Sequence, residues 1–228
     1  PRLEFLSKMS GSEKVIPAAI EFVDIAGLVQ GASEGAGLGN KFLANIRETD
    51  AIVQVVRCFE NDDIIHELGT VDPLRDIEII NAELILADHA SLTKRRVSRE
   101  KTSRGNDKEA NKELEVIDKI LPHLDEGKPA ITADINDDDY EIMKEFFLLT
   151  SKRTIFACNV SEDDLADTIN IPKDNSMVAR VQQYAEETHG AEIIIISARI
   201  EEELIDVSPE EAKEFLADMG VVDSGFST

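Results

Sequence analysis

Four short runs of β-branched, aliphatic and aromatic residues constrain the fold of this chain most strongly. They cover residues 20–24, 51–58, 154–159 and 192–197. Helical patterns lie between them, and strands that alternate with helices predict an α/β fold whose parallel sheet is covered on both faces. In such sheets ligands bind beyond the carboxyl ends of the strands. Polar residues stand at three of the expected ends: Asp24, Asn159 and Ser197.

The middle of the chain carries a different pattern. Apolar residues step by three and four over 77–91 and again over 114–124, which is the spacing of a coiled-coil seam. The polar segment 95–111 joins the two runs, so the pattern predicts an antiparallel coiled-coil hairpin that projects from the α/β domain. We therefore expect a first part of the α/β domain in 1–76, a helical insertion in 77–149, a second α/β part in 150–207 and a helical linker in 208–228.

The charge balance limits the partners that this chain can bind. Its 228 residues include 47 acidic and 24 basic side chains, which leaves a net charge of −23. Such a chain is a poor non-specific binder of nucleic acid as a whole. One segment differs, because six basic residues and a single acid lie between positions 94 and 104. At a hairpin tip this basic cluster can reach RNA phosphates, or it can be a solvated helical face: Lys94, Arg95, Arg96, Arg99, Lys101 and Arg104.

The two cysteines, Cys58 and Cys158, are far apart in the sequence and have no metal-ligand spacing. We expect them to be small core residues, and their scarcity favours a reducing, cytoplasmic compartment. No apolar stretch approaches the roughly 20 residues that span a bilayer, so no membrane partner is expected.

The tetrapeptide from Asp24 to Gly27 ends the first run, and a glycine-rich loop follows it. In a phosphate-binding switch, an aspartate at a strand end holds Mg²⁺, usually through water. The glycine lets its backbone N–H approach the γ-phosphate, because no Cβ intervenes. The same four residues can also form a simple Asx turn, so the tetrapeptide alone leaves both interpretations open.

Two further motifs accompany it, the run from Asn159 to Glu162 and the pair Ser197-Ala198. In this order the three motifs match the third, fourth and fifth nucleotide motifs of a GTPase-like domain. Longer runs at 21–29, 37–43, 45–50 and 55–63 resemble the YchF/Obg-like ATPase family, and the similarity continues to about Ala217. The resemblance implies a P-loop NTPase domain of the GTPase type, interrupted by the helical hairpin.

The resemblance also indicates what this sequence does not contain. Members of the family begin with a G-x-x-x-x-G-K-[ST] loop, which nothing here matches, and end in a small TGS domain. We therefore expect an internal fragment that is inactive without the P-loop, whose backbone amides and lysine cradle the phosphates.

The base-recognition motif departs from the usual guanine reader, Asn-Lys-x-Asp. Val160 stands in place of the lysine and Glu162 in place of the aspartate, so guanine selectivity should weaken. The resemblance implies that ATP is preferred or accepted, and GTP stays an alternative. Asn159 is expected to contact the base, with further contacts from the backbone N–H groups of Ser197 and Ala198.

The catalytic group is the least constrained part of the sequence. Ras-like hydrolases place a water-orienting glutamine directly after the switch glycine, whereas this chain has Leu28. The resemblance implies that His66 substitutes for it, and the near-neutral pKa of an unperturbed histidine suits proton handling. An ordinary surface histidine is the alternative. Arg57 is expected to pair with a carboxylate such as Glu60.

These features favour a parent protein that hydrolyses ATP with Mg²⁺, with GTP as a further candidate substrate. The resemblance implies a molecular switch that works on the ribosome or with a translation factor. The alternative is a non-catalytic adaptor that binds the ribosome or RNA through the basic cluster.

Overall fold

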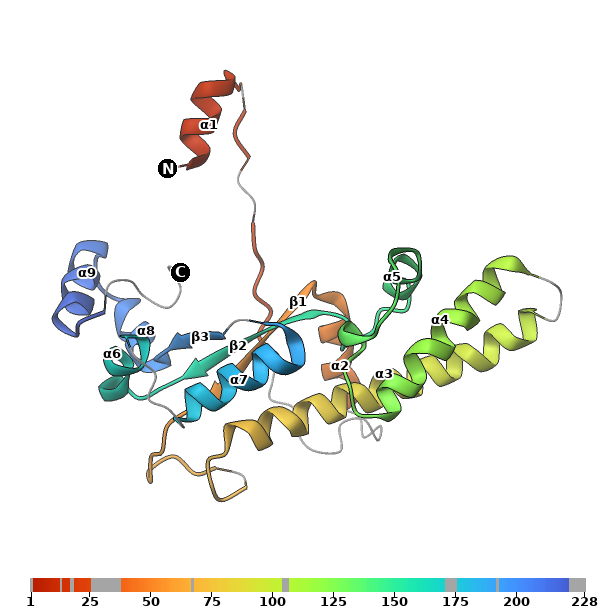
Figure 1. Ribbon diagram of the computed structural model, residues 1–228. Coiled ribbons are helices and arrows are strands. Elements are labelled where there is room, and N and C mark those ends of the chain that lie inside the picture. Colours follow the sequence, from red (N-terminus) through yellow and green to blue (C-terminus); the bar gives the residue numbers. More distant parts are fainter. Residues whose placement is uncertain are drawn as a thin grey trace.

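The computed structural model describes residues 2–12, 14–16, 19–25, 38–66, 68–103, 107–170, 176–191 and 193–221. Within them, three strands form one parallel sheet in the order β1-β2-β3 (Figure 1). The strands are β1 (Ala51–Arg57), β2 (Arg153–Asn159) and β3 (Ile193–Ile196). The predicted α/β class, the parallel sheet and three of the four predicted strands are thereby confirmed.

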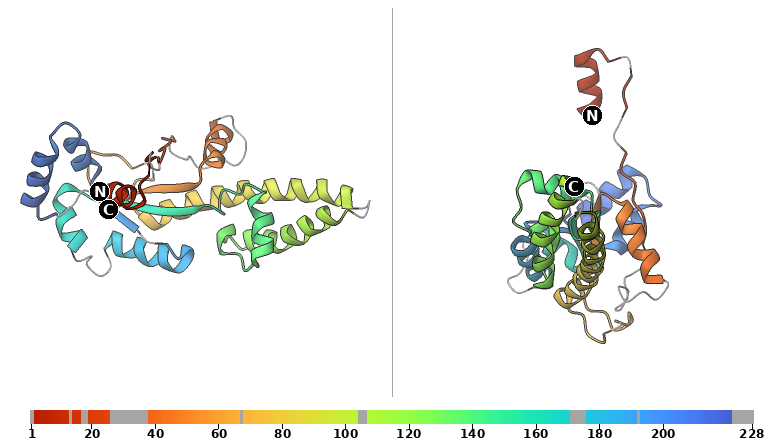
Figure 2. Two further views of the ribbon diagram at one scale, coloured as in Figure 1. Left: turned by 90° about the horizontal axis from the view of Figure 1, so that it is seen from above. Right: turned by 90° about the vertical axis from the view of Figure 1, so that its right-hand side faces the viewer.

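Helices connect and flank these strands (Figures 1 and 2). Before β1 come α1 (Arg2–Ser10), which stands apart from the rest, and α2 (Leu38–Glu48). Between β1 and β2 lie α3 (Pro73–Ser103), α4 (Lys108–Asp125), the 3₁₀ turn η2 (Ala130–Thr132) and α5 (Asp137–Lys144). Between β2 and β3 lie α6 (Glu162–Asn170) and α7 (Met177–His189), and after β3 come α8 (Ala198–Leu204) and α9 (Pro209–Asp218). None of the described helices is long and apolar enough to cross a membrane.

One face of the sheet carries the main core. Phe156 and Cys158 of β2 are fully buried there against Val181 of α7 and Ile77 of α3. Helices α3 and α7 thus cover this face, which stabilises the sheet by removing apolar surface from water.

The opposite face is less covered than the sequence predicts. On it, Val53, Val55 and Ile155 are 43%, 63% and 41% exposed. Because side chains alternate along a strand, these residues point away from the main core. The prediction of a sheet covered on both faces is therefore wrong for the described part of the chain.

The predicted strand at residues 20–24 is also wrong. These residues form no strand, and Ile20 and Phe22 are 82% and 74% exposed. An apolar segment becomes a strand only when another backbone pairs with its N–H and C=O groups. No described strand pairs with this segment, so its β propensity alone does not form one.

Helix α3 links the sheet to the helical hairpin, because it belongs to three hydrophobic clusters. Its first turns pack on the sheet through Ile77, and its middle packs on α2 through Leu84. Its later turns pack on α4 and α5 through Leu92. The helix runs without interruption through the boundary expected at residue 77, and the division into domains stays a prediction.

Helices α3 and α4 pack antiparallel, as predicted (Figure 1). The polar segment 95–111 is nevertheless mostly helical, since α3 continues to Ser103 and α4 begins at Lys108. Its charges pair within the hairpin, for example Arg96 with Glu100 one helical turn later. Such i,i+4 pairs stabilise a helix, so polarity alone wrongly indicated a long connecting turn.

Helix α9 begins where the sequence predicts. The side chain of Ser208 accepts a hydrogen bond from the backbone N–H of Glu211, and the Glu211 side chain accepts one from the backbone N–H of Ser208. This reciprocal capping box satisfies two donors that a helix start would otherwise leave without partners.

Candidate functional site

The carboxyl ends of the three strands meet at one edge of the sheet. Asn159, the last residue of β2, lies opposite Arg57 of β1 and Ile196 of β3. The pairing extends one step further, because the Cys58 N–H donates to the Asn159 carbonyl at 2.8 Å. The Val160 N–H donates to the Ile196 carbonyl at 2.9 Å. These two hydrogen bonds extend the backbone pairing past the end of β2 on both sides. They do so at the edge of the sheet where α/β folds bind ligands.

The side chain of Asn159 is fixed by the helix that follows β3. Its Oδ1 accepts a hydrogen bond from the backbone N–H of Ala198 at 2.9 Å. Ala198 is the first residue of α8, and the first N–H groups of a helix lack partners within it. Ser197, the N-cap, is 2% exposed and makes no side-chain capping bond. Asn159 takes over the capping, and its NH₂ group has no partner among the described residues.

Val160 and Glu162 lie differently from what their motif suggests. Val160 is 4% exposed and packs in the main core, so its side chain points inward. Glu162 begins α6, and its carboxylate lies 2.5 Å from Nε of Arg199 in α8. Arg199 is largely exposed and Glu162 is partly exposed, so this ion pair contributes little stability, but it directs the Glu162 carboxylate toward α8.

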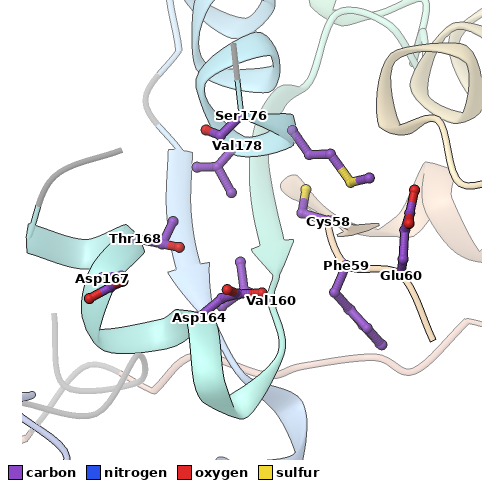
Figure 3. Close-up of a pocket in the computed structure, with 10 residues that line it drawn as sticks. Cys58, Phe59, Glu60, Val160, Asp164, Asp167, Thr168, Ser176 and Val178 are labelled. Carbon is purple, nitrogen blue, oxygen red and sulfur yellow. The ribbon is translucent and has the colours of Figure 1, made fainter. Parts of the chain in front are cut away.

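A pocket of about 230 Å³ opens beside this edge, between the loop after β1 and helices α6 and α7 (Figure 3). Its lining combines apolar side chains, including Val160 and Val178, with three carboxylates: Glu60, Asp164 and Asp167. Acidic groups repel phosphates, so the pocket is unsuited to the phosphates of a nucleotide. The pocket was not predictable from the sequence, because its lining comes from three separate segments.

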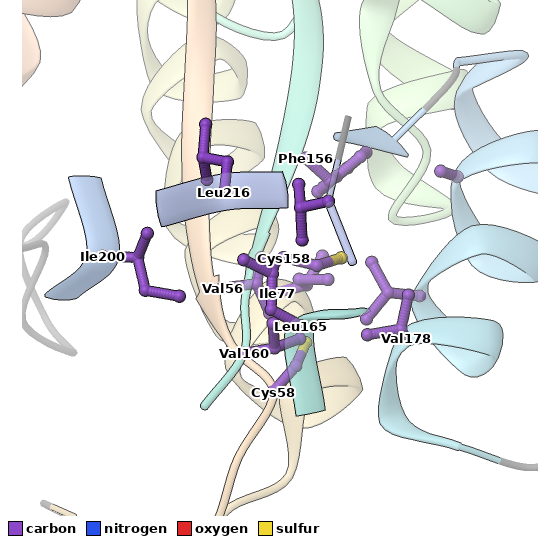
Figure 4. Close-up of a cluster of buried hydrophobic side chains, with 13 residues drawn as sticks. Val56, Cys58, Ile77, Phe156, Cys158, Val160, Leu165, Val178, Ile200 and Leu216 are labelled. Carbon is purple, nitrogen blue, oxygen red and sulfur yellow. The ribbon is translucent and has the colours of Figure 1, made fainter. Parts of the chain in front are cut away.

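The cysteines belong to the core, as predicted. Cys158 is fully buried in β2 and Cys58 follows β1, and both lie in the main hydrophobic cluster (Figure 4). The hydrogen bond to Cys158, together with burial, raises the pKa of the Cys58 thiol far above its usual range. A thiol in such surroundings stays protonated, so it is neither a nucleophile nor a ready metal ligand.

His66 lies in the loop between β1 and α3, with both ring nitrogens engaged. Nε2 is 2.8 Å from Oδ2 of Asp76 in the first turn of α3, and Nδ1 accepts a hydrogen bond from the Leu68 N–H at 3.2 Å. Its side chain is 15% exposed. The sequence reasoning missed Asp76, although an acidic residue in the first turn of the next helix was visible. No hydrogen bond between described residues joins His66 to Asn159.

Arg57 does not pair with Glu60, contrary to prediction. Its guanidinium donates to three backbone carbonyls of the same loop, those of Phe59 at 3.1 Å, Asn61 at 3.2 Å and Ile64 at 3.0 Å. The planar fork of five donors suits an arginine to several carbonyls at once. Arg57 therefore shapes the loop that leads to His66.

The switch motif is only partly described. Asp24 is exposed and makes no ion pair with another described residue, while Gly27 and Leu28 lie outside the described residues. In the described part of the chain no three His, Cys, Asp or Glu side chains are grouped to hold a metal ion. Mg²⁺ needs no such cage, because it commonly takes one or two carboxylates with waters and substrate phosphates. The open carboxylate of Asp24 fits that requirement.

Three residues of the basic cluster are engaged by acids. Arg95 and Arg99 both pair with Glu113 of α4, at 2.9 and 2.8 Å. Arg96 pairs with Asp118 at 2.6 Å as well as with Glu100. Lys94 and Lys101 are exposed, and Arg104 lies outside the described residues. The charge that the cluster presents to solvent is therefore smaller than its composition suggests.

Comparisons with known proteins agree with this architecture. A family model described as a 50S ribosome-binding GTPase matches residues 7–82. "Ribosome-binding ATPase YchF" of Haemophilus influenzae is 44% identical over 227 residues, which cover 100% of this chain and 60% of that protein. The Bacillus subtilis protein of the same name is 43% identical over 224 residues, which cover 98% of this chain and 60% of that protein.

A solved structure extends the comparison to the fold. The Schizosaccharomyces pombe YchF GTPase superposes with a TM-score of 0.77 at 34% identity, over 96% of this chain and 59% of that chain. The fold is accordingly that of a P-loop GTPase-like domain. This chain spans about 60% of the length of the curated relatives it matches. Over the length that it shares with these relatives, the chain is similar in sequence and in fold to members of the YchF family.

Proposed function

We propose that the protein containing this chain binds and hydrolyses ATP, and accepts GTP less well, as a switch on the ribosome. The observation that carries the proposal is the position of Asn159. It stands at the carboxyl end of the central strand, where α/β folds bind ligands. Its Oδ1 is used by Ala198, which leaves the NH₂ group to face a base. The names of the bacterial relatives, which describe ribosome-binding ATPases, support ATP as the substrate and the ribosome as the partner. The name of the Schizosaccharomyces pombe relative, a GTPase, supports GTP as a further substrate.

The arrangement of Asn159 and Glu162 supports a preference for ATP. The NH₂ group of Asn159 can donate to N7, an acceptor that adenine and guanine share, so Asn159 alone does not choose the base. Guanine selection needs a carboxylate that accepts from the N1–H and the N2 amine. The ion pair with Arg199 engages the Glu162 carboxylate instead. Without that acceptor, guanine has no advantage.

The other roles follow from the chemistry of each group. Asp24 would hold Mg²⁺, usually through water, and the metal would neutralise charge on the phosphates. The backbone N–H of Gly27 would meet the γ-phosphate. The backbone of Ser197 and Ala198 would border the base, and His66 would orient the attacking water. The loop after Gly27 would respond to the γ-phosphate and so alter the grip on the ribosome.

Two measurements test the two parts of this proposal separately. Phosphate release tests the hydrolysis of ATP, and sedimentation with ribosomes tests the nucleotide-dependent association. In the full-length natural protein we expect phosphate release from ATP that stops when EDTA removes Mg²⁺. We also expect ribosome association to differ several-fold between a non-hydrolysable ATP analogue and ADP. Equal association in every nucleotide state, with no phosphate release, would instead support the non-catalytic adaptor.

Contact of the hairpin with RNA is part of the same proposal. Among the described residues of the basic cluster, Lys94 and Lys101 are the exposed cations proposed for this contact, since Arg95, Arg96 and Arg99 are paired with acids. Changing both lysines to glutamate should weaken ribosome association, make it less dependent on salt and leave nucleotide affinity unchanged. Lys112→Glu is the matched control, because Lys112 is an exposed cation of the neighbouring helix α4.

A further inference from the structure

The two ring nitrogens of His66 play opposite hydrogen-bonding roles. Nδ1 faces the backbone N–H of Leu68 at 3.2 Å, and that N–H can only donate. Nε2 faces Oδ2 of Asp76 at 2.8 Å, and an ionised carboxylate can only accept. The neutral ring must therefore carry its hydrogen on Nε2 and keep its lone pair on Nδ1. These partners determine the tautomer of His66.

Asp76 is itself held in place as a carboxylate. It lies in the first turn of α3, where the helix dipole favours negative charge. Its Oδ1 lies 3.4 Å from Nη2 of Arg75, and Arg75 in turn donates to the hydroxyl and the carbonyl of Thr70. The carboxylate thus has one oxygen toward Arg75 and the other toward His66, so its orientation is constrained from both sides.

We propose that Asp76 is a positioning residue for hydrolysis, which fixes His66 in the Nε2–H tautomer so that Nδ1 receives the attacking water. This inference rests on the proposed function of His66. Nδ1 is the nitrogen with the longer hydrogen bond, to a donor in an exposed loop, and a water replaces that donor when nucleotide binds. The ring itself stays attached to α3 through Asp76.

In the hydrolysis step the water oxygen bonds to the γ-phosphorus while the bond from that phosphorus to the bridging oxygen breaks. The electron pair of the broken bond stays on the bridging oxygen, which leaves as part of ADP. The water proton passes to Nδ1 of His66, and the carboxylate of Asp76 compensates the positive charge that develops on the ring. His66 later returns the proton to solvent. A carboxylate that fixes the tautomer of a catalytic histidine in this manner acts through the histidine, without touching substrate.

The first test is spectroscopic and needs no catalysis. In the full-length natural protein with ¹⁵N-labelled histidine, two-bond ¹⁵N–¹H correlations report which ring nitrogen carries the hydrogen. His66→Gln assigns the signal. The spectra are recorded with a non-hydrolysable ATP analogue bound, when Leu68 no longer holds Nδ1. We expect the Nε2–H pattern in the unchanged protein, a mixture of tautomers in Asp76→Ala, and recovery in Asp76→Glu. Asp72→Asn is the matched control, since Asp72 pairs with Arg180 and not with His66. An unaltered tautomer in Asp76→Ala would overturn the inference.

The second test is kinetic. Asp76→Ala should lower kcat for ATP by about 10-fold to 100-fold with little change in KM, because a positioned base contributes roughly 10²–10⁴-fold. The double variant that combines Asp76→Ala with His66→Ala should have the same kcat as His66→Ala alone, because the two residues act as one unit. If His66→Ala alone keeps full kcat, the proposed function of His66 fails. If His66→Ala is slow and Asp76→Ala is normal, only the role of Asp76 fails. Thermal unfolding of Asp76→Asn, which keeps the side-chain volume, controls for misfolding.

Discussion

The Oδ1 atom of Asn159 accepts a hydrogen bond from the backbone N–H of Ala198 at 2.9 Å. This single bond joins the end of β2 to the start of α8, 39 positions later in the chain. The bond distinguishes the two ends of the carboxamide, since the oxygen accepts this hydrogen bond and the NH₂ group has no partner among the described residues. Substitution can therefore test the two ends separately.

Asn159→Asp should separate them, because aspartate keeps the acceptor oxygen and loses the NH₂ donor. We expect nucleotide affinity to fall about 10-fold, equivalent to about 1.4 kcal/mol, while the free energy of unfolding changes by less than about 0.5 kcal/mol. Asn159→Ala should reduce both, since the Ala198 N–H also loses its cap. Calorimetric titration and chemical denaturation measure the two quantities. Unchanged affinity in Asn159→Asp would remove Asn159 from the binding site.

Asp88 of α3 should be important for stability. It is 1% exposed, and it accepts hydrogen bonds from the N–H groups of Leu149 and Thr150 at 2.8 Å and from the Thr150 hydroxyl at 2.7 Å. Asp88→Asn places an NH₂ donor opposite other hydrogen-bond donors. We therefore expect the free energy of unfolding, measured by chemical denaturation, to fall by about 1–3 kcal/mol. Glu78→Gln, an exposed change on the same helix, should cost less than about 0.5 kcal/mol. Equal effects of the two would contradict this account.

Glu113 should be important for the hairpin. Its side chain is 4% exposed and neutralises both Arg95 and Arg99, and Arg95 also lies over the ring of Phe146 at 4.6 Å. Glu113→Gln removes the charge that two arginines share, and we expect about 1–3 kcal/mol of destabilisation. Glu115→Gln on the same helix is exposed and serves as the control. The denaturation midpoints of the two variants should differ clearly, and coincident midpoints would show that the ion pairs contribute nothing.

The capping box of α9 should make stability depend on pH. The hydrogen bonds from the Ser208 hydroxyl and backbone N–H lower the pKa of Glu211 below its ordinary value of 4.5. A carboxyl with a lowered folded pKa stabilises the fold above its unfolded pKa, and this contribution is lost as pH falls through the folded pKa. The Tm difference between the unchanged protein and Glu211→Gln should therefore be fully present at pH 6 and shrink as the pH falls below 4.5. Glu210→Gln removes the same charge outside the cap and should show a smaller pH dependence.

Much of the sheet could be predicted from the sequence, because β-branched runs between turn residues form strands in most settings. The same reasoning failed at Ile20 and Phe22, where the composition is right but no described strand supplies hydrogen bonds. It also failed at Arg96, where charged residues looked like a turn although they form ion pairs along and between helices. The first case depends on a strand partner distant in the sequence, and the second on ion pairs to Glu100 one helical turn away and to Asp118 across the hairpin. Composition alone contains neither.

The candidate site was predictable to a similar degree. The expectation that polar residues meet at the strand ends places Asn159 near Ala198, because carboxyl ends of parallel strands share one edge. The direction of each hydrogen bond was not predictable. The partner of His66 was not predictable either. The path of the loop from β1 to Asp76 depends on the three backbone carbonyls that accept hydrogen bonds from Arg57.

The most direct test of the account is a titration of ATP and of GTP, each with Mg²⁺, into the full-length natural protein. We predict tighter binding of ATP, because Asn159 offers a donor that both bases accept while the Glu162 carboxylate is engaged by Arg199. Equal or tighter binding of GTP would contradict the account of base selection and leave the fold intact. Binding of neither nucleotide would contradict the central claim, that this edge of the sheet is a nucleotide site.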